Sequence, residues 1–202
     1  TSPFVHDDLA NGTCYHYVVT VVTQKGESLE SQEVMAIPSP YLLAMAFGQE
    51  GAEDGEFSSP TGLTLDKDGN MYVADTDNHS IQKFSKDGKF IARWGSEPSS
   101  QEGCFYYPRG LAVGPDEVIY IADSGNNRVQ KFDLEGNAMK AWGKFGFAWR
   151  GADMGKFDVP WGITTDQEGN VYVSDTSNAR VQKFQGDGQP LLKWGRAGSF
   201  DG

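Results

Sequence analysis

The chain has 202 residues, of which 38% are hydrophobic and 22% are charged, and its formal net charge is −11. This length suffices for one large domain or two modest ones, and the absence of any run of about 18 apolar residues excludes a membrane-spanning helix. The acidic balance disfavours nucleic-acid binding, because such a chain repels phosphate backbones and the sequence contains no basic patch. The 25 glycines favour short strands joined by tight turns.

The first forty residues form a module of their own. Apolar and polar residues alternate in two stretches separated by a glycine-containing turn, which is typical of antiparallel strands. This module resembles the last strands of a fibronectin type III domain, whose tyrosine corner Leu9 and Tyr15 match. We therefore predict the C-terminal strands of a fibronectin type III-like sandwich over residues 1–38 and a short linker over 39–41.

A single strand is predicted next, before any repeat. The stretch 42–48 aligns with the end of a later unit at 90–95, and both stretches finish with an aromatic residue followed by glycine. The stretch therefore reads as a lone outer strand, placed to complete a blade whose inner strands lie elsewhere in the assembly.

Three tandem repeats follow. Alignment on Pro60, Pro108 and Pro160 also aligns a glycine, a tyrosine, an aspartate and an asparagine, and then the motifs Gln-Lys-Phe and Trp-Gly, without a gap. Each unit is predicted to form four short strands, because alternating apolar stretches are separated by glycine-containing turns. Four-stranded units in tandem predict a β-propeller, in which each sheet is stabilised by its neighbours. The predicted repeats span about 49–95, 96–143 and 144–195.

These motifs, as they stand in residues 41–202, resemble the NHL repeat family. The resemblance implies an all-β fold with NHL-type propeller blades: three complete four-stranded repeats plus one lone outer strand, in a ring that most often has six blades. The sequence departs from the pattern at Ser80, which stands where the other units have arginine, and at Gly114 and Glu117 in the second unit. Three blades leave a ring open, so either a longer polypeptide or a second copy in a homo-oligomer would complete it.

Most of the repeated polar and aromatic residues are predicted to be structural, because an active site is normally used once rather than in every blade. The aspartate and asparagine of each unit are expected to close the turn between the second and third strands, and the tryptophan to pack between blades. These residues are Asp75, Asp123, Asp175, Asn78, Asn126, Asn178, Trp94, Trp142 and Trp194.

The candidate ligand-binding residues are those that differ from unit to unit at the end of the propeller where loops converge. The residue between the proline and the glycine is expected near the channel mouth, and the variable loops add further aromatic and basic side chains. These candidates are Thr61, Arg109, Trp161, Tyr106, Tyr107, Trp149 and Arg150. Aromatic faces near carboxylates suit a sugar ring or a basic peptide, and the alternative is that the aromatic residues only pack the loops onto the ring.

No catalytic constellation, metal site or cofactor site is predicted. The sequence contains no CxxC motif, and of its three histidines only His79 lies in the repeats. Cys14 and Cys104 are predicted to be free thiols, with a disulfide between them as the alternative.

The sequence thus favours a non-catalytic, extracytoplasmic binding or scaffolding protein. The pairing of the two modules resembles bacterial exported cell-surface proteins, and the propeller would contact a protein or glycan partner, without nucleic acid and without membrane insertion. The alternative is a metal-dependent lyase or lactonase-type enzyme whose site lies in blades outside this segment. RNA binding, which is known for some NHL propellers, ranks last because of the acidic charge.

Overall fold

The computed structural model describes residues 46–95, 97–144 and 153–195, together with the backbone of four short strands nearer the N-terminus. The chain divides into two compact units, Thr1–Ala46 and Phe47–Gly202. The division falls later than the boundary that the sequence predicts before residue 42. In the described residues no helix is long and apolar enough to span a bilayer.

The N-terminal unit contains two antiparallel strand pairs. Strand β1 (Tyr15–Tyr17) pairs with β4 (Val34–Ala36), and β2 (Val22–Thr23) pairs with β3 (Gly26–Glu27). The rest of residues 1–38 lies outside the described part of the chain. The fibronectin type III-like sandwich therefore stays a prediction.

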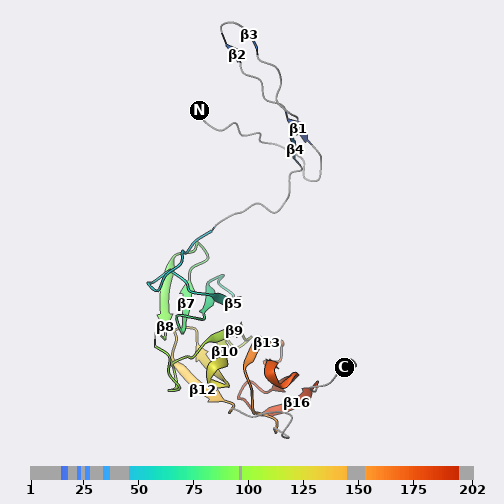
Figure 1. Cartoon of the computed structure of the whole chain (residues 1–202). Helices are drawn as coiled ribbons and strands as arrows, with labels where there is room; N and C mark the ends of the chain where they lie inside the picture. The colour runs from blue at the N-terminus through green and yellow to red at the C-terminus, as the bar shows by residue number, and fades with distance from the viewer. Residues whose placement is uncertain are drawn as a thin grey trace. The chain divides into compact units, whose positions relative to one another are not determined.

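The second unit contains one four-stranded antiparallel sheet per repeat, as predicted, and in each sheet the strands follow one another in chain order (Figure 1). Blade 1 consists of β5 (Pro60–Leu65), β6 (Met71–Asp75), β7 (Ser80–Phe84) and β8 (Phe90–Trp94). Blade 2 consists of β9 (Pro108–Val113), β10 (Val118–Asp123), β11 (Arg128–Asp133) and β12 (Ala138–Trp142). Blade 3 consists of β13 (Pro160–Thr165), β14 (Val171–Asp175), β15 (Arg180–Phe184) and β16 (Pro190–Trp194).

An aspartate fixes the turn between the first two strands of blade 1. The carboxylate of Asp66 accepts hydrogen bonds from the backbone N–H groups of Asp68 and Asn70, the side-chain amide of Asn70 and the hydroxyl of Tyr72. Burial by itself would raise the pKa of Asp66, but these hydrogen bonds outweigh it and lower the pKa. The carboxylate is therefore held by its own hairpin, as is typical of an aspartate in a tight turn.

The blades are stacked face to face. Residues from blades 1 and 2 form one buried apolar cluster, which includes Tyr72, Trp94 and Phe132, and residues from blades 2 and 3 form a second cluster. Every residue of β10 is buried, because blade 2 has a neighbour on both faces. In β14 buried and half-buried residues alternate, which is the pattern of a sheet covered on one face only.

Aromatic contacts join each blade to the next. The ring of Trp94 in blade 1 stacks on Phe132 in blade 2, with centroids 6.0 Å apart, and the ring of Trp142 lies 6.1 Å from Phe184 in blade 3. Trp94 and Trp142 thus each pack against the following blade.

The predicted lone outer strand is only partly described. Residues 42–45 lie outside the described part of the chain, and Ala46–Gly48 are not in a strand. Phe47 nevertheless lies 5.0 Å from the ring of Phe84, and an added Cβ on Gly48 would contact Phe57 at 2.5 Å. Phe47 and Gly48 therefore pack on blade 1 as the Trp-Gly pair that ends each blade packs on the blade after it.

Candidate binding surface

The residues between each proline and glycine lie side by side where the first strands of the blades meet. The hydroxyl of Thr61 contacts the carbonyl oxygen of Arg109 at 3.3 Å. An added Cβ on Gly62 would lie 2.1 Å from that same oxygen, and one on Gly110 would lie 2.3 Å from the carbonyl oxygen of Trp161. Only glycine permits this close approach of neighbouring strands, which explains the glycines at 62 and 110, two residues after their prolines.

Arg109 and Trp161 form a stacked pair across the boundary between blades 2 and 3. The guanidinium carbon of Arg109 lies 3.8 Å from the centroid of the Trp161 ring. Trp161 is 44% exposed, so the pair is open to solvent. The arrangement joins a cation, an aromatic face and the Thr61 hydroxyl in one row of three predicted binding residues.

Tyr106 and Tyr107 form a second aromatic group, together with His79 of blade 1. The His79 ring lies 5.4 Å from Tyr106 and 4.6 Å from Tyr107, and its Nδ1 accepts the backbone N–H of Tyr107 at 3.2 Å. The two tyrosines are 40% and 37% exposed. Sequence reasoning did not select His79 as a member of this group, since the contact joins two different blades.

The remaining predicted binding residues, Trp149 and Arg150, lie outside the described residues. Their predicted role therefore stays a prediction. The described candidates all come from blades 1, 2 and 3 at the end where each first strand begins.

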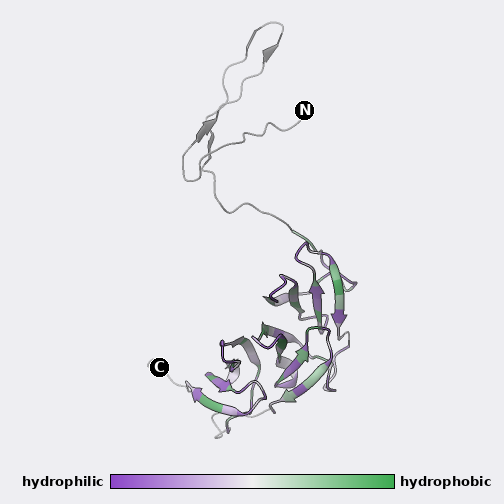
Figure 2. Ribbon diagram, turned by 180° about the vertical axis from the view of Figure 1, so that it is seen from behind, coloured by the Kyte–Doolittle hydropathy of each residue, from purple (hydrophilic) through white to green (hydrophobic). Residues whose placement is uncertain are grey.

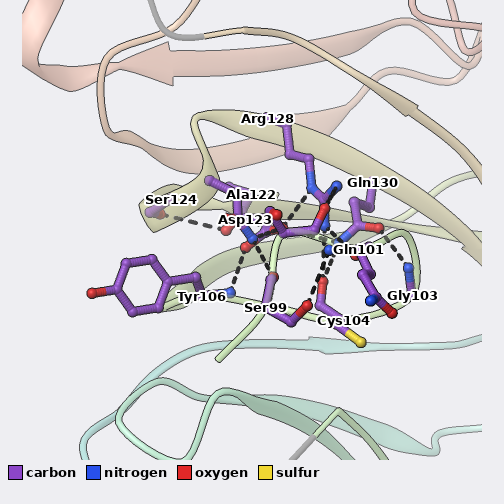
Figure 3. Close-up of polar contacts among 12 residues, drawn as sticks. Ser99, Gln101, Gly103, Cys104, Tyr106, Ala122, Asp123, Ser124, Arg128 and Gln130 are labelled. Carbon is purple, nitrogen blue, oxygen red and sulfur yellow. Dashed lines mark hydrogen bonds and ion pairs between the residues drawn. The ribbon is translucent and has the colours of Figure 1, made fainter. Parts of the chain in front are cut away.

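The repeated aspartate of blade 2 lies at the centre of a hydrogen-bond network (Figure 3). The buried carboxylate of Asp123 accepts the backbone N–H of Tyr106 at 2.8 Å and side-chain donors from Asn126, Arg128 and Gln130 at 2.7–3.0 Å. Burial raises the pKa of Asp123, although these hydrogen bonds act in the opposite direction. All the partners of this carboxylate are internal, so the network holds the blade and does not face a ligand.

Arg128, the arginine of this network, also holds the loop that precedes blade 2. Arg128 donates to the carbonyl oxygens of Ser100 and Gln101 at 2.8 and 2.7 Å, and Asn126 donates to Ser99. Asp175, Asn178 and Arg180 repeat the carboxylate contacts in blade 3.

Blade 1 replaces this arginine in a way that the sequence alone did not reveal. Ser80 stands in the arginine position, and its buried hydroxyl has no hydrogen-bond partner among the described residues. Arg93, in the outer strand, instead donates to the carbonyl oxygens of Ala52 and Glu53, which align with Ser100 and Gln101. The loop is thus held at the same two positions by a different strand.

The free face of blade 3 presents the side chains that blades 1 and 2 bury. Figure 2 shows a hydrophobic stretch on β16, where Leu192 and Trp194 are exposed. A recess of about 560 Å³ is lined there by residues that include Tyr172, Thr176 and Val181. The recess therefore repeats an interblade face, and the surface that lines it is mainly apolar.

Within the ranges that the structure describes, no group of three His, Cys, Asp or Glu side chains is arranged to hold a metal ion. Cys104 is a free, half-buried thiol, and Cys14 lies outside these ranges.

The family comparison matches the blades directly. The model described as NHL repeat matches residues 57–84, 105–132 and 157–184, which run from the phenylalanine before each proline to the phenylalanine of Gln-Lys-Phe. The chain contains three NHL repeats. The resemblance noted from the motifs is thereby confirmed for the repeats, while the number of blades in a complete ring stays a prediction.

Several relatives share short parts of these NHL repeats. Protein lin-41 of Caenorhabditis elegans is 45% identical over 49 residues, which are 24% of this chain and 4% of the relative. Protein brain tumor of Drosophila melanogaster is 41% identical over 49 residues, 24% of this chain and 5% of the relative. RING finger protein nhl-1 of C. elegans is 35% identical over 79 residues, 38% of this chain and 8% of the relative. The matches thus span only 4–8% of the length of these relatives.

Similar solved structures support the propeller-like arrangement of the NHL blades. Virginiamycin B lyase from Staphylococcus aureus has a TM-score of 0.54 at 14% identity, covering 90% of this chain and 50% of that one. The gluconolactonase XC5397 from Xanthomonas campestris has a TM-score of 0.52 at 20% identity, covering 71% and 49%. At these identities the likeness extends to the fold alone.

Proposed function

We propose that this NHL segment is a non-catalytic binding or scaffolding module that contacts a protein partner through the end bearing Thr61, Arg109 and Trp161. One observation carries the proposal. The polar residues that recur in the blades are engaged in internal hydrogen bonds, as around Asp123, whereas Thr61 and Trp161, which differ between blades, are exposed at this end beside the half-buried Arg109. Exposed tryptophan, tyrosine and arginine are the residue types that dominate protein interfaces.

The relatives add support for a protein partner. One relative of the NHL repeats, from Bos taurus, is named an E3 ubiquitin-protein ligase, and another is named a RING finger protein. A glycan partner is the less favoured form of the proposal, since a sugar ring would use the same aromatic faces but has no support from the relatives.

The first experiment compares two exposed tryptophans. Partners retained by the immobilised protein are identified by quantitative mass spectrometry, and their affinities are then measured by calorimetry with Trp161→Ala and Trp194→Ala. Trp161→Ala should weaken binding about tenfold or more, because a tryptophan at the centre of an interface acts as a hot spot. Trp194→Ala, which removes an equally exposed tryptophan from the outer strand of blade 3, should leave the affinity unchanged. Equal affinities for the wild-type protein and Trp161→Ala would exclude this end as the binding surface.

Location and assembly are part of the proposal. An extracytoplasmic, cell-surface setting is proposed from the fibronectin type III resemblance of residues 1–38, and an export signal in the full coding sequence would test it.

Ring closure by a second copy is less favoured, because Phe47 and Gly48 already occupy the position on blade 1 that Trp194 and Gly195 of a docked copy would need.

The alternative function is a metal-dependent lyase or lactonase-type enzyme with its site outside the described residues. Two of the similar solved structures are named a lyase and a gluconolactonase, at identities that support the fold alone. Metal analysis of the full-length protein distinguishes the two functions, since a stoichiometric zinc or calcium ion would favour the enzyme.

A further inference from the structure

The arginines of the described blades fall into two groups. Arg93, Arg128 and Arg180 each contact a carboxylate and donate hydrogen bonds to backbone carbonyl oxygens. Arg109 has neither a hydrogen bond nor an ion pair through its side chain within the described residues, and its buried Nε is without a partner. An unpaired guanidinium in a chain of net charge −11 is a group left available for an anionic ligand.

The stack on Trp161 holds this guanidinium in place. A guanidinium whose face covers an aromatic ring keeps its N–H groups at the edge, where they can donate in parallel to both oxygens of a carboxylate. The fixed orientation reduces the side-chain entropy that is lost on binding. Trp161 is 44% exposed, so an apolar residue flanking the carboxylate would find aromatic surface.

We propose that Arg109, stacked on Trp161, binds the side-chain carboxylate of a glutamate or aspartate in an acidic peptide segment of the partner. This inference rests on the proposed function and reverses one sequence-based expectation, since Arg109 at this end suits an acidic peptide better than a basic one. A polyphosphate backbone is the less favoured anion. Asp77 and Asp158 lie in the loops at the same end, and they would repel many phosphates while tolerating one carboxylate.

The test uses four fluorescein-labelled peptides of sequence Ser-Leu-X-Leu-Tyr-Ser, in which X is Glu or Gln and the C-terminus is free or amidated. A labelled twelve-nucleotide oligouridine is the fifth probe. Affinities are measured by fluorescence anisotropy with the wild-type protein, Arg109→Met and Lys140→Met. Both variants lose one positive charge, but Lys140 lies in the outer strand β12, and unchanged thermal unfolding shows that each variant is folded.

The amidated Glu peptide is expected to bind the wild-type protein about threefold to tenfold more tightly than the amidated Gln peptide, as for a partly exposed ion pair with bidentate hydrogen bonds. This ratio should fall to about one in Arg109→Met, persist in Lys140→Met and shrink as salt is raised.

Three outcomes would overturn the inference. They are equal binding of the Glu and Gln peptides, discrimination that depends only on the free C-terminus, and oligouridine binding that is lost in Arg109→Met. In the first case, a partner whose binding is lost in Trp161→Ala would show that the proposed function stands while the carboxylate site is wrong. If the partner identified by mass spectrometry instead binds Trp161→Ala as tightly as the wild-type protein, the proposed function is wrong as well.

Discussion

Trp94→Ala is expected to lower the free energy of unfolding by about 3–5 kcal/mol, the cost of removing a large buried aromatic side chain. Trp94 is only 8% exposed, because blade 2 covers it, and its ring stacks on Phe132 and packs against Tyr72. Trp194 occupies the same repeat position but is 47% exposed on the free face of blade 3. Trp194→Ala should therefore cost about 1 kcal/mol or less.

Urea unfolding of the two tryptophan variants, followed by circular dichroism, measures this difference. Because the substitution is the same in both variants, the difference between their stability losses reports the packing of blade 2 over Trp94. Equal losses of stability in the two variants would contradict the stacking of blade 2 on blade 1.

Gly110→Ala is expected to be the second large effect, with a loss of stability of about 3 kcal/mol, the upper part of the range for overpacking. The new Cβ would lie 2.3 Å from the carbonyl oxygen of Trp161 and 3.1 Å from the backbone nitrogen of Ile163. Both atoms belong to the neighbouring strand, so the two blades would have to separate.

Gly162→Ala is the matched control for this substitution. A Cβ there meets only the side-chain oxygen of Ser174, at 3.1 Å, and this side chain can move. Its cost should be about 1 kcal/mol or less. Thermal and urea unfolding of the two alanine variants provide the comparison. A Gly162→Ala variant as unstable as Gly110→Ala would contradict the close approach of β9 to β13 as the cause of the loss.

The sequence predicted the strands well because local patterns determine them. The alternation and the glycine turns of blade 1 predict its third strand over 80–84 and its fourth over 90–94, and both strands lie within these bounds. The first strand is predicted over 62–65 but begins at Pro60, because a register shift between Pro60 and Gly62 lets the strand extend back to the proline. The short 3-10 helices Ser124–Asn126 and Thr176–Asn178 were not predicted, since a single turn carries no periodic signal.

The candidate site could be predicted only in part. Alignment of the repeats identified Thr61, Arg109 and Trp161 as equivalent positions, but no local pattern revealed that Arg109 lies over Trp161, 52 residues away. The replacement of a missing arginine at Ser80 by Arg93 was invisible for the same reason. Contacts between blades depend on how the sheets stack. The repeat pattern shows which positions are equivalent in all units, but it does not show which side chains of two particular blades meet.

The most direct measurement of blade stacking is the solvent accessibility of individual tryptophans. Fluorine NMR of protein labelled with 5-fluorotryptophan, with signals assigned by Trp→Phe variants, reports the relaxation that a soluble paramagnetic agent causes at each ring. Strong relaxation is expected at Trp161 and Trp194, and weak relaxation at Trp94. Relaxation at Trp94 as strong as at Trp194 would contradict the account, because an exposed Trp94 means that blade 2 does not cover blade 1.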